Sequence, residues 1–161
     1  MKALPVLLLI AAALCAAPSS AAPATRAPAA AALPSIDDGY PAPTLQELEP
    51  RVRYTFSGLR FVPLKPGKGE LPKPGQEVAV KYIGWTADGS EFDGSYKRGE
   101  PFRFKLGEGN VIKGWEQGLA DMRPGERRYL IIPPELGYGA QGVGPIPPNA
   151  TLIFDVERVD F

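Results

Sequence analysis

The sequence contains no histidine and a single cysteine, Cys15, and these two shortages exclude several classes of enzyme. Without histidine, neither a Ser-His-Asp nor a Cys-His catalytic arrangement can be built. Zinc sites made from cysteine and histidine are excluded for the same reason, and no stretch has the Asp-rich spacing of a calcium loop. We therefore expect a function that needs no side-chain nucleophile, no metal and no cofactor.

An excess of positive charge is also missing, because 18 Lys and Arg residues balance 18 Asp and Glu residues. Proteins whose main partner is a nucleic acid usually carry a basic surface that neutralises phosphates. The balance therefore argues against a nucleic-acid partner, although it leaves room for a small local basic patch.

The apolar run near the start of the chain is shorter than the ~20 residues that a membrane-spanning helix requires. Residues 1–21 have the pattern of a secretory signal peptide: a lysine near the start, then the apolar run, then small residues with Ser19 and Ala21 at the cleavage positions. Two alternatives stay open. One is an uncleaved membrane anchor, and the other is a lipid anchor on Cys15, although Leu14 stands where a lipoprotein signal has a small residue.

Cleavage near Ala21 would remove Cys15 and leave a mature chain without cysteine. Its net charge would be 17 minus 18, or −1, because Lys2 is the one charged residue removed. The simple architecture of the signal favours a bacterial protein that is exported to the periplasm or secreted.

Residues 22–57 are expected to form an Ala/Pro-rich tether and an N-terminal extension. Proline and the lack of large apolar side chains deny residues 22–34 a stable helix or core. Residues 36–56 have more bulk, and a short helix around Leu45–Leu48 could pack on the following domain. We expect a monomer, since no long amphipathic helix is present to form a dimerisation arm.

Short strand patterns separated by Gly and Pro fill residues 58–161, which we take as one domain. The strand candidates are residues 58–64, 77–85, 90–95, 101–107, 126–133 and 151–161. In the last one, Leu152, Phe154 and Val156 alternate with Asp155 and Glu157. This alternation predicts a largely antiparallel sheet of about five strands with one covered face and one wet face.

A single strong helical pattern lies among these strands, in the stretch VIKGWEQGL at residues 111–119. Its apolar stripe consists of Val111, Ile112, Trp115, Leu119 and Met122. Gly114 and Gly118 border that stripe, although each glycine costs about 1 kcal/mol relative to alanine in a helix interior. Small residues there let the helix axis approach the sheet. One helix covering a curved sheet is an α+β arrangement.

Aromatic residues are more numerous than one helix and a short sheet need for packing. They are Tyr82, Phe92, Phe102, Trp115, Tyr138 and Phe154. A concave pocket lined by aromatic rings and a few polar groups is typical of a site for a small apolar ligand. The simpler alternative is that Trp115 belongs to a filled core, where its indole N–H would still need an acceptor.

Four motifs in residues 58–161 occur in a fixed order: FD, G-x-x-x-VI-x-GWE, YG-x-x-G and IPPN-x-x-L-x-F-x-V. With them, the chain resembles the FKBP-type peptidyl-prolyl cis-trans isomerases, and the leader and tether resemble secreted bacterial members. The resemblance implies a curved five-stranded antiparallel sheet half-wrapped around one short helix. It also implies that the active pocket lies between the sheet and the helix.

The resemblance also assigns roles to individual residues. Trp115 would form the floor that meets the substrate proline, and the backbone N–H of Ile112 would bind a substrate carbonyl. Asp93 and Tyr138 would be the catalytic polar residues beside the rotating amide, with Asp93 orienting the Tyr138 hydroxyl or facing the carbonyl carbon. The walls would be Tyr82, Phe92, Phe102, Val111, Ile112 and Phe154, and Ile146 would close the rim.

The expected activity is isomerisation of X-Pro bonds in unfolded or partly folded exported proteins, with possible binding of tacrolimus-like macrolides. Some features differ from the familiar eukaryotic pattern: the loop at residues 140–146 is one residue shorter, and Leu136 replaces an aromatic residue. Asp93 could instead be a structural carboxylate that caps a turn. Two other functions stay open, a non-catalytic proline-binding or chaperone module and a cell-envelope assembly factor.

Overall fold

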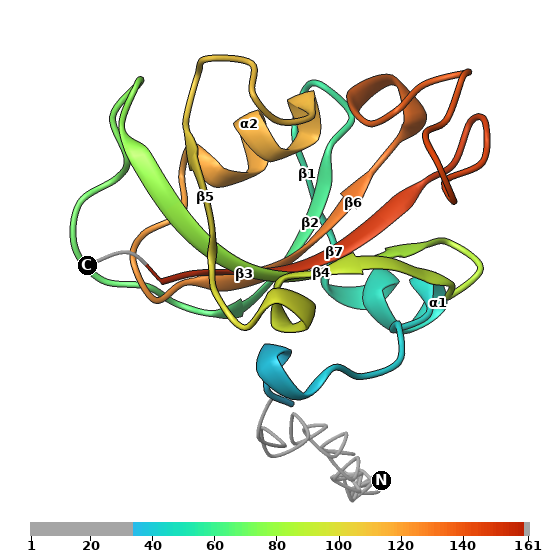
Figure 1. Cartoon of the computed structure of the whole chain (residues 1–161), viewed down its shortest axis with the longest axis horizontal. Helices are drawn as coiled ribbons and strands as arrows, with labels where there is room; N and C mark the ends of the chain where they lie inside the picture. Colours follow the sequence, from blue (N-terminus) through green and yellow to red (C-terminus); the bar gives the residue numbers. More distant parts are fainter. Residues whose placement is uncertain (1–33, 160–161) are drawn as a thin grey trace, which may run out of the picture. The chain divides into compact units, whose positions relative to one another are not determined.

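The computed structural model describes residues 34–159. The expected signal peptide at residues 1–21 and the first part of the tether therefore lie outside the described residues. Between residues 34 and 159, no helix is long and apolar enough to cross a membrane. Figure 1 shows a curved antiparallel sheet with the helix α2 (Lys113–Leu119) on its concave side.

The sheet contains seven strands rather than the expected five, although the α+β class is confirmed. They are β1 (Arg53–Tyr54), β2 (Arg60–Lys65), β3 (Glu77–Thr86), β4 (Glu91–Gly94), β5 (Phe102–Lys105), β6 (Arg127–Ile132) and β7 (Leu152–Arg158). The order is β1-β2-β6-β7-β3-β4, and β5 also pairs with β3. The expected count was too low because β4 and β5 pair separately with opposite ends of the long strand β3, and because β1 has two residues and no detectable pattern.

The helix α2 lies deep against the sheet because its two glycines face branched side chains of β6. A Cβ atom built on Gly114 would lie 2.6 Å from Cγ2 of Ile132, and one on Gly118 would lie 2.8 Å from Cδ1 of Leu130. The helix is shorter than the apolar stripe suggested, since it begins at Lys113 after Ile112, its N-cap. Val111 and Ile112 consequently belong to the preceding loop and face the space between helix and sheet.

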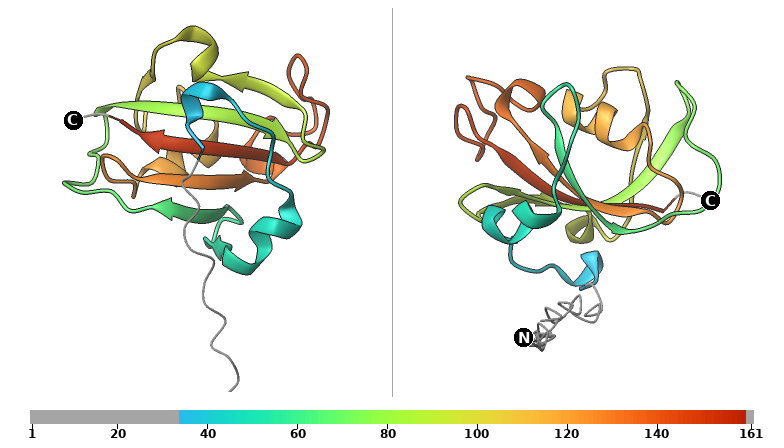
Figure 2. Two further views of the ribbon diagram at one scale, coloured as in Figure 1. Left: turned by 90° about the horizontal axis from the view of Figure 1, so that it is seen from below. Right: turned by 180° about the vertical axis from the view of Figure 1, so that it is seen from behind.

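The second face of the sheet is covered, so the expectation of a wet face is wrong. Residues 34–52, which we call the N-terminal strap, cross this face in the left view of Figure 2. The strap contains three short helices, η1 (Ile36–Asp38), α1 (Leu45–Leu48) and η2 (Glu49–Arg51). Thr44 and Glu47 form a capping box that starts α1, at the position expected for a short helix packing on the domain.

A second apolar core lies between the strap and the sheet. Its buried members are Ile36, Leu48, Val62, Ile83, Trp85, Tyr129, Ile131 and Ile153. Asp155, which alternation in the sequence assigned to solvent, is 0 % exposed and pairs with the buried Arg127. The sheet is therefore packed on both faces, with α2 on one and the strap on the other.

Candidate active site

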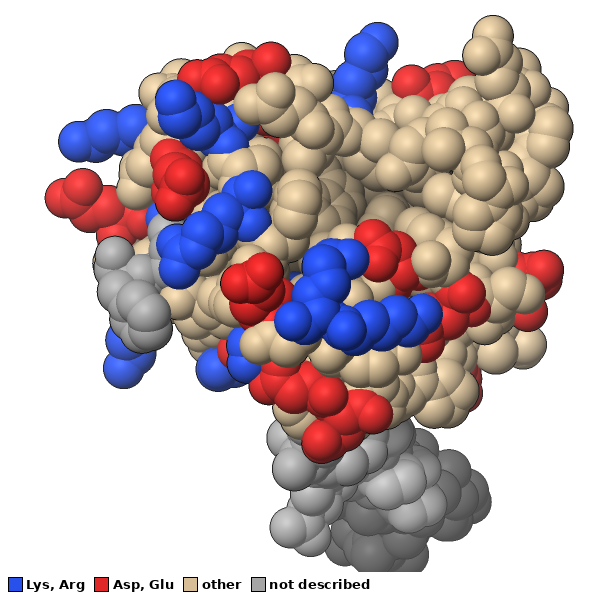
Figure 3. All heavy atoms as spheres, in the orientation of Figure 1, with Lys and Arg blue, Asp and Glu red and all other residues tan. Residues whose placement is uncertain are grey.

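A cavity of about 430 Å³ opens between α2, the loop before it and the strands β3, β4 and β5. Its lining residues are Tyr82, Phe92, Asp93, Arg98, Phe102, Asn110, Val111, Ile112, Trp115, Tyr138 and Phe154. In Figure 3 the surface is hollowed beside the charged side chains near the centre of the view. The size falls in the range of small-ligand sites, about 300–1,000 Å³.

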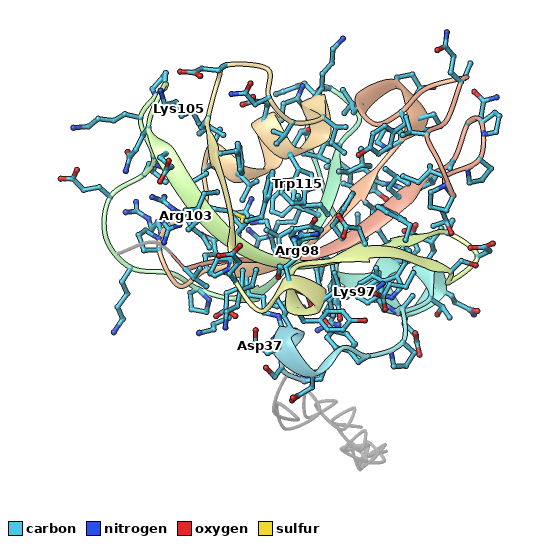
Figure 4. All side chains as sticks on the ribbon, in the orientation of Figure 1. Asp37, Lys97, Arg98, Arg103, Lys105 and Trp115 are labelled. Carbon is cyan, nitrogen blue, oxygen red and sulfur yellow. The ribbon has the colours of Figure 1, made fainter. Side chains whose placement is uncertain are left out.

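Trp115 forms the floor of this cavity and is held by other aromatic rings. Its ring centroid lies 4.9 Å from that of Tyr82 and 5.2 Å from that of Phe154, both in edge-on geometry. Phe102 approaches from β5 at 6.0 Å. Figure 4 shows Trp115 on the side of α2 that faces the sheet. Edge-to-face contacts of this kind fix the indole plane and leave its other surface to the cavity.

The indole N–H of Trp115 has no acceptor among the described residues, although the side chain is only 4 % exposed. An indole sealed in a filled core normally donates a hydrogen bond to a neighbour. The missing acceptor and the adjoining cavity both fit a pocket floor better than a filled core.

One wall of the cavity carries a hydrogen-bonded group of three polar side chains. The hydroxyl of Tyr82 donates to Asp93 Oδ2 and accepts from Arg98, whose terminal nitrogen lies 2.6 Å away. Arg98 also pairs with Asp93 at 3.0 Å, and the Gly94 N–H donates to Asp93 at 2.8 Å. Asp93 is thus bonded to Tyr82 and not to Tyr138, the partner that the sequence suggested.

These contacts set the charge state of the wall. Burial alone raises the pKa of Asp93, but the hydrogen bonds from Tyr82, Arg98 and Gly94 outweigh burial and hold that pKa below its ordinary value. Burial and the bond to Asp93 raise the pKa of Tyr82, although Arg98 opposes the shift. Near neutral pH the cavity therefore presents an ionised Asp93 and a neutral Tyr82 hydroxyl.

Tyr138 also lines the cavity, and its hydroxyl has no hydrogen-bond partner within residues 34–159. Burial, followed by the charge of Asp93, raises the pKa of Tyr138, so the hydroxyl keeps its proton. It is available to donate a hydrogen bond to a bound molecule.

The loop that leads into α2 is tied down by Glu116, a residue of the helix itself. The Glu116 carboxylate accepts from the N–H groups of Gly107 at 2.6 Å and Gly109 at 3.0 Å. Both glycines have positive φ, +85° and +72°, a conformation that other residues rarely adopt. The loop turned in this way places Val111 and Ile112 on the cavity wall.

The backbone N–H of Ile112 has no acceptor in the part of the chain that the structure describes. The carbonyl of Ile112 accepts from Trp115 N at 2.9 Å and Glu116 N at 3.2 Å, which closes the first turn of α2. An unpaired N–H at the start of a helix is a ready donor to a ligand carbonyl.

All the site residues predicted from sequence line the cavity except Ile146, which is 6 % exposed and belongs to the core cluster that also contains Trp115 and Phe154. Sequence reasoning missed Arg98, Asn110 and Glu116. Arg98 belongs to the one-turn helix η3 (Ser95–Arg98), which is too short to show a periodic pattern. The carboxylate of Glu116 binds backbone amides of two loop glycines, and hydrophobic periodicity gives no signal for such a contact. In residues 34–159 no group of acidic or thiol side chains is placed to hold a metal ion.

Comparison with known proteins gives consistent matches to this part of the chain. Residues 68–159 match the family model described as FKBP-type peptidyl-prolyl cis-trans isomerase. FK506-binding protein 1 of Dictyostelium discoideum is 51 % identical over 105 residues, which are 65 % of this chain and 98 % of that protein. FkpA of Escherichia coli strain K12 is 49 % identical over 112 residues, 70 % of this chain and 41 % of FkpA.

Solved structures agree with these relatives. The crystal structure of FkpA from Escherichia coli matches with a TM-score of 0.64 and 49 % identity, over 68 % of this chain and 51 % of that chain. The crystal structure of AtFKBP13 matches with a TM-score of 0.65 and 40 % identity, over 68 % of this chain and 97 % of that chain. The match thus spans nearly all of the small relatives but about half or less of FkpA.

Proposed function

The chain belongs to the FKBP-type peptidyl-prolyl cis-trans isomerases, and on this basis we propose that the cavity floored by Trp115 binds X-Pro segments and accelerates rotation about the prolyl amide. The observation that carries the proposal is the cavity itself. An indole floor, aromatic walls and a few polar groups meet in a space of about 430 Å³. A proline ring is apolar and compact, and aromatic faces bury it well.

Rotation about a peptide bond is slow because resonance gives the C–N bond partial double-bond character. The barrier is about 18–20 kcal/mol, and for X-Pro bonds it makes exchange take on the order of tens to hundreds of seconds. No covalent bond breaks in this reaction. A catalyst needs only to bind the twisted amide more tightly than the planar forms, and each ~1.36 kcal/mol of preference gives about tenfold in rate.

The aromatic cavity can supply such a preference because a bound prolyl segment displaces water from its indole and phenyl rings. A planar amide carries a larger charge separation than a twisted one, so it loses more when water is replaced by indole and phenyl rings. Apolar burial against Trp115 holds the proline ring in the meantime. This part of the mechanism uses the rings of the floor and walls and needs no proton transfer.

Three polar groups are proposed to bind the peptide backbone around the proline. The Ile112 N–H and the Tyr138 hydroxyl donate to substrate carbonyl oxygens, since neither is engaged within the described chain. The ionised Asp93 faces the carbonyl carbon of the twisting bond. Arg98 holds Asp93 and Tyr82 in place rather than contacting the amide.

The natural substrates are proposed to be X-Pro segments of exported polypeptides during folding, in the periplasm or outside a bacterial cell. The signal-like residues 1–21 support this proposal. The relatives include both eukaryotic proteins and FkpA of Escherichia coli. Mass spectrometry of the mature N-terminus tests it, and an intact residue 1 would contradict it.

Tacrolimus-like macrolides are proposed to occupy the same cavity. FK506-binding protein 1 of Dictyostelium discoideum is among the matched relatives whose names refer to FK506 binding. Val143 is 57 % exposed in the loop at residues 140–146, the loop that differs from the familiar eukaryotic pattern. We expect the affinity to depend on this loop.

An isomerisation assay on a short X-Pro peptide tests the enzymatic function. We expect catalysis by the wild-type domain and a loss of about tenfold in kcat/KM for Tyr138→Phe, because one hydrogen bond contributes about 1 kcal/mol or slightly more. Asp93→Val should also lower turnover while the fold is kept. Tyr54→Phe, an exposed tyrosine outside the cavity, is the matched control and should leave the rate unchanged.

An uncatalysed rate with the purified wild-type protein would refute the enzymatic proposal. Binding of the peptide without turnover would then support a non-catalytic proline-binding module instead.

A further inference from the structure

The N-terminal strap lies outside residues 68–159, the part that matches the isomerase family model. Two of its side chains are nevertheless buried as deeply as those in the core of the domain. Ile36 and Leu48 are 2 % and 1 % exposed, and the ring of Tyr40 lies 5.5 Å from that of Trp85 in β3. The strap is therefore built into the domain and has a specific binding site on the sheet.

A buried ion pair fastens the strap to the sheet. Arg127 donates to both carboxylate oxygens of Asp155, at 2.9 and 2.8 Å. Arg127 also donates to the Pro34 carbonyl at 2.7 Å and the Tyr40 hydroxyl at 2.9 Å, and Tyr40 in turn donates to Asp155. Buried ion pairs need such additional hydrogen bonds to offset the cost of desolvation. The strap supplies partners that the sheet alone lacks.

The strap also touches the short helix that carries a cavity residue. Gly39 packs on Tyr96 of η3 so closely that a Cβ atom there would lie 3.0 Å from the ring. Asp37 pairs with Lys81 of β3 at 2.6 Å. The Tyr96 ring also lies against Gly94, and its hydroxyl donates to Glu91 of β4 at 2.8 Å. Tyr96 thus fills the space between the strap and the β3–β4 edge of the sheet.

Tyr96 stands in sequence between the two charged residues of the cavity wall, Asp93 and Arg98. Arg98 is the last residue of η3, and its guanidinium reaches back to Asp93 and to the hydroxyl of Tyr82. In the view of Figure 4, Arg98 lies between Asp37 of the strap and Trp115. A shift of η3 away from the sheet would move the origin of the Arg98 side chain.

We propose that the N-terminal strap is a positioning element of the active site: by packing on Tyr96 it fixes η3, so that Arg98 holds Asp93 and the Tyr82 hydroxyl against the cavity. The catalytic part of this inference rests on the proposed isomerase function. The mechanical part, the coupling of the strap to η3, does not depend on catalysis. The full domain thus begins at the strap and not at the first residue of the family match.

The test uses the full chain with Ile36→Ala, which loosens the strap, and Tyr40→Phe, which removes its hydrogen bonds to Arg127 and Asp155 but keeps the ring. We expect kcat/KM to fall by about threefold to tenfold in each, comparable to a lost hydrogen bond. In an Arg98→Ala background the same two changes should have a clearly smaller further effect, because residues that act through one group are not additive. Val62→Ala is the matched control, since Val62 is buried in the same second core but belongs to β2.

A second measurement separates the coupling from catalysis. The Gly99 N–H donates to the Tyr96 carbonyl and closes η3, so its hydrogen exchange reports the order of that helix. Exchange at Gly99 should be faster in Ile36→Ala and unchanged in Val62→Ala. This result supports the coupling even if the wild-type protein shows no turnover, in which case the proposed function fails and the coupling stands.

Three results would overturn the inference. The first is an equal loss of activity in Ile36→Ala and Val62→Ala, which would mean that the strap contributes only to the overall stability of the fold. The second is a loss that persists in full when Arg98 is already alanine. The third is wild-type exchange at Gly99 in a protein whose strap has been loosened.

Discussion

Replacing Gly114 by alanine sets helix propensity against packing, and the two effects have opposite signs. In a helix interior, alanine is better than glycine by about 1 kcal/mol. The new Cβ atom, however, would lie 2.6, 2.7 and 2.9 Å from three side-chain atoms of Ile132. Ile132 is 0 % exposed, and its branched side chain has no free space to rotate into. Overpacking of a filled core costs about 1–3 kcal/mol, so we expect a net loss of about 1 kcal/mol.

The midpoint of unfolding in urea measures the stability part of this prediction. The functional part follows because Trp115 is the next residue: a helix pushed away from β6 carries the indole with it, and kcat/KM for an X-Pro peptide should fall. Gly118→Ala is the comparison. Leu130 is also 0 % exposed, but the new Cβ atom would meet its two end methyl groups at 2.8 Å and its branching carbon only at 3.4 Å, a milder overlap that the gain of about 1 kcal/mol in helix propensity offsets. We expect Gly118→Ala to be close to neutral in stability.

Adding Ile132→Val to Gly114→Ala removes one of the three clashing atoms. The double variant should therefore be less destabilised than the sum of the two single variants. The reasoning is refuted if Gly114→Ala raises the unfolding free energy by the ~1 kcal/mol that propensity alone gives. In that event the glycines of α2 serve no close approach to the sheet.

Two further changes test the contacts around the cavity. Asp93 has a folded-state pKa below its ordinary value, so its ionised form stabilises the fold above about pH 4 and this stability is lost as the pH falls through the folded pKa. Arg98→Ala should raise the pKa of Asp93 toward the ordinary value. In a pH profile of kcat/KM, activity should then be lost at a higher pH on the acid side than in the wild type. An unchanged acid side of the profile would contradict the role of Arg98 in holding that pKa down. Glu116→Gln keeps one acceptor oxygen for the amides of Gly107 and Gly109, so kcat/KM should fall by about threefold to tenfold, and hydrogen exchange of those amides should accelerate. Lys113→Gln, an exposed change on the same helix, is the control and should leave both measurements unchanged.

The cavity floor and walls could be predicted because they lie on strongly patterned segments. Alternation placed Tyr82 and Phe154 on the inner face of the sheet, and helical spacing placed Trp115 on the side of the helix that faces them. The positions of these three residues needed no motif, since the period of a strand or helix fixes which face a side chain occupies. The family resemblance then assigned roles to Asp93 and Tyr138, which lie in a four-residue strand and in a loop, where no period applies.

The residues that escaped prediction lie where the backbone is irregular. Arg98 reaches the cavity because η3 turns the chain within a few residues and ends at Gly99 with a φ of +73°. Glu116 lies in a helix, but the partners of its carboxylate are the amides of Gly107 and Gly109, two glycines with positive φ in the preceding loop. Ile146, predicted at the rim, is buried in the core cluster that also contains Trp115 and Phe154, and it is not among the cavity-lining residues. Loop geometry of this kind has no counterpart in hydrophobic periodicity.

The sequence did contain a sign that the second face of the sheet is covered, but the alternating pattern of residues 151–161 was given more weight. In β3 the residues that alternate with Tyr82 include Ile83 and Trp85, both apolar, and both belong to the second core. Apolar residues on both faces of a strand are typical of a sheet packed on both sides. The sequence did not reveal the strap as the covering segment, because its prolines interrupt regular structure and none of its helices is longer than four residues.

The consequence for the active site follows from the geometry of β3 alone. Successive residues of a strand point to opposite faces, so Tyr82 lines the cavity while Ile83, the next residue, contacts the core under the strap. The backbone between them is the shared support of both. A strap that holds Ile83 and Trp85 in place therefore also limits the movement of Tyr82, independently of the contact through Tyr96. Both routes act on Tyr82, so we expect a loosened strap to change the position of the Tyr82 hydroxyl before that of other cavity groups.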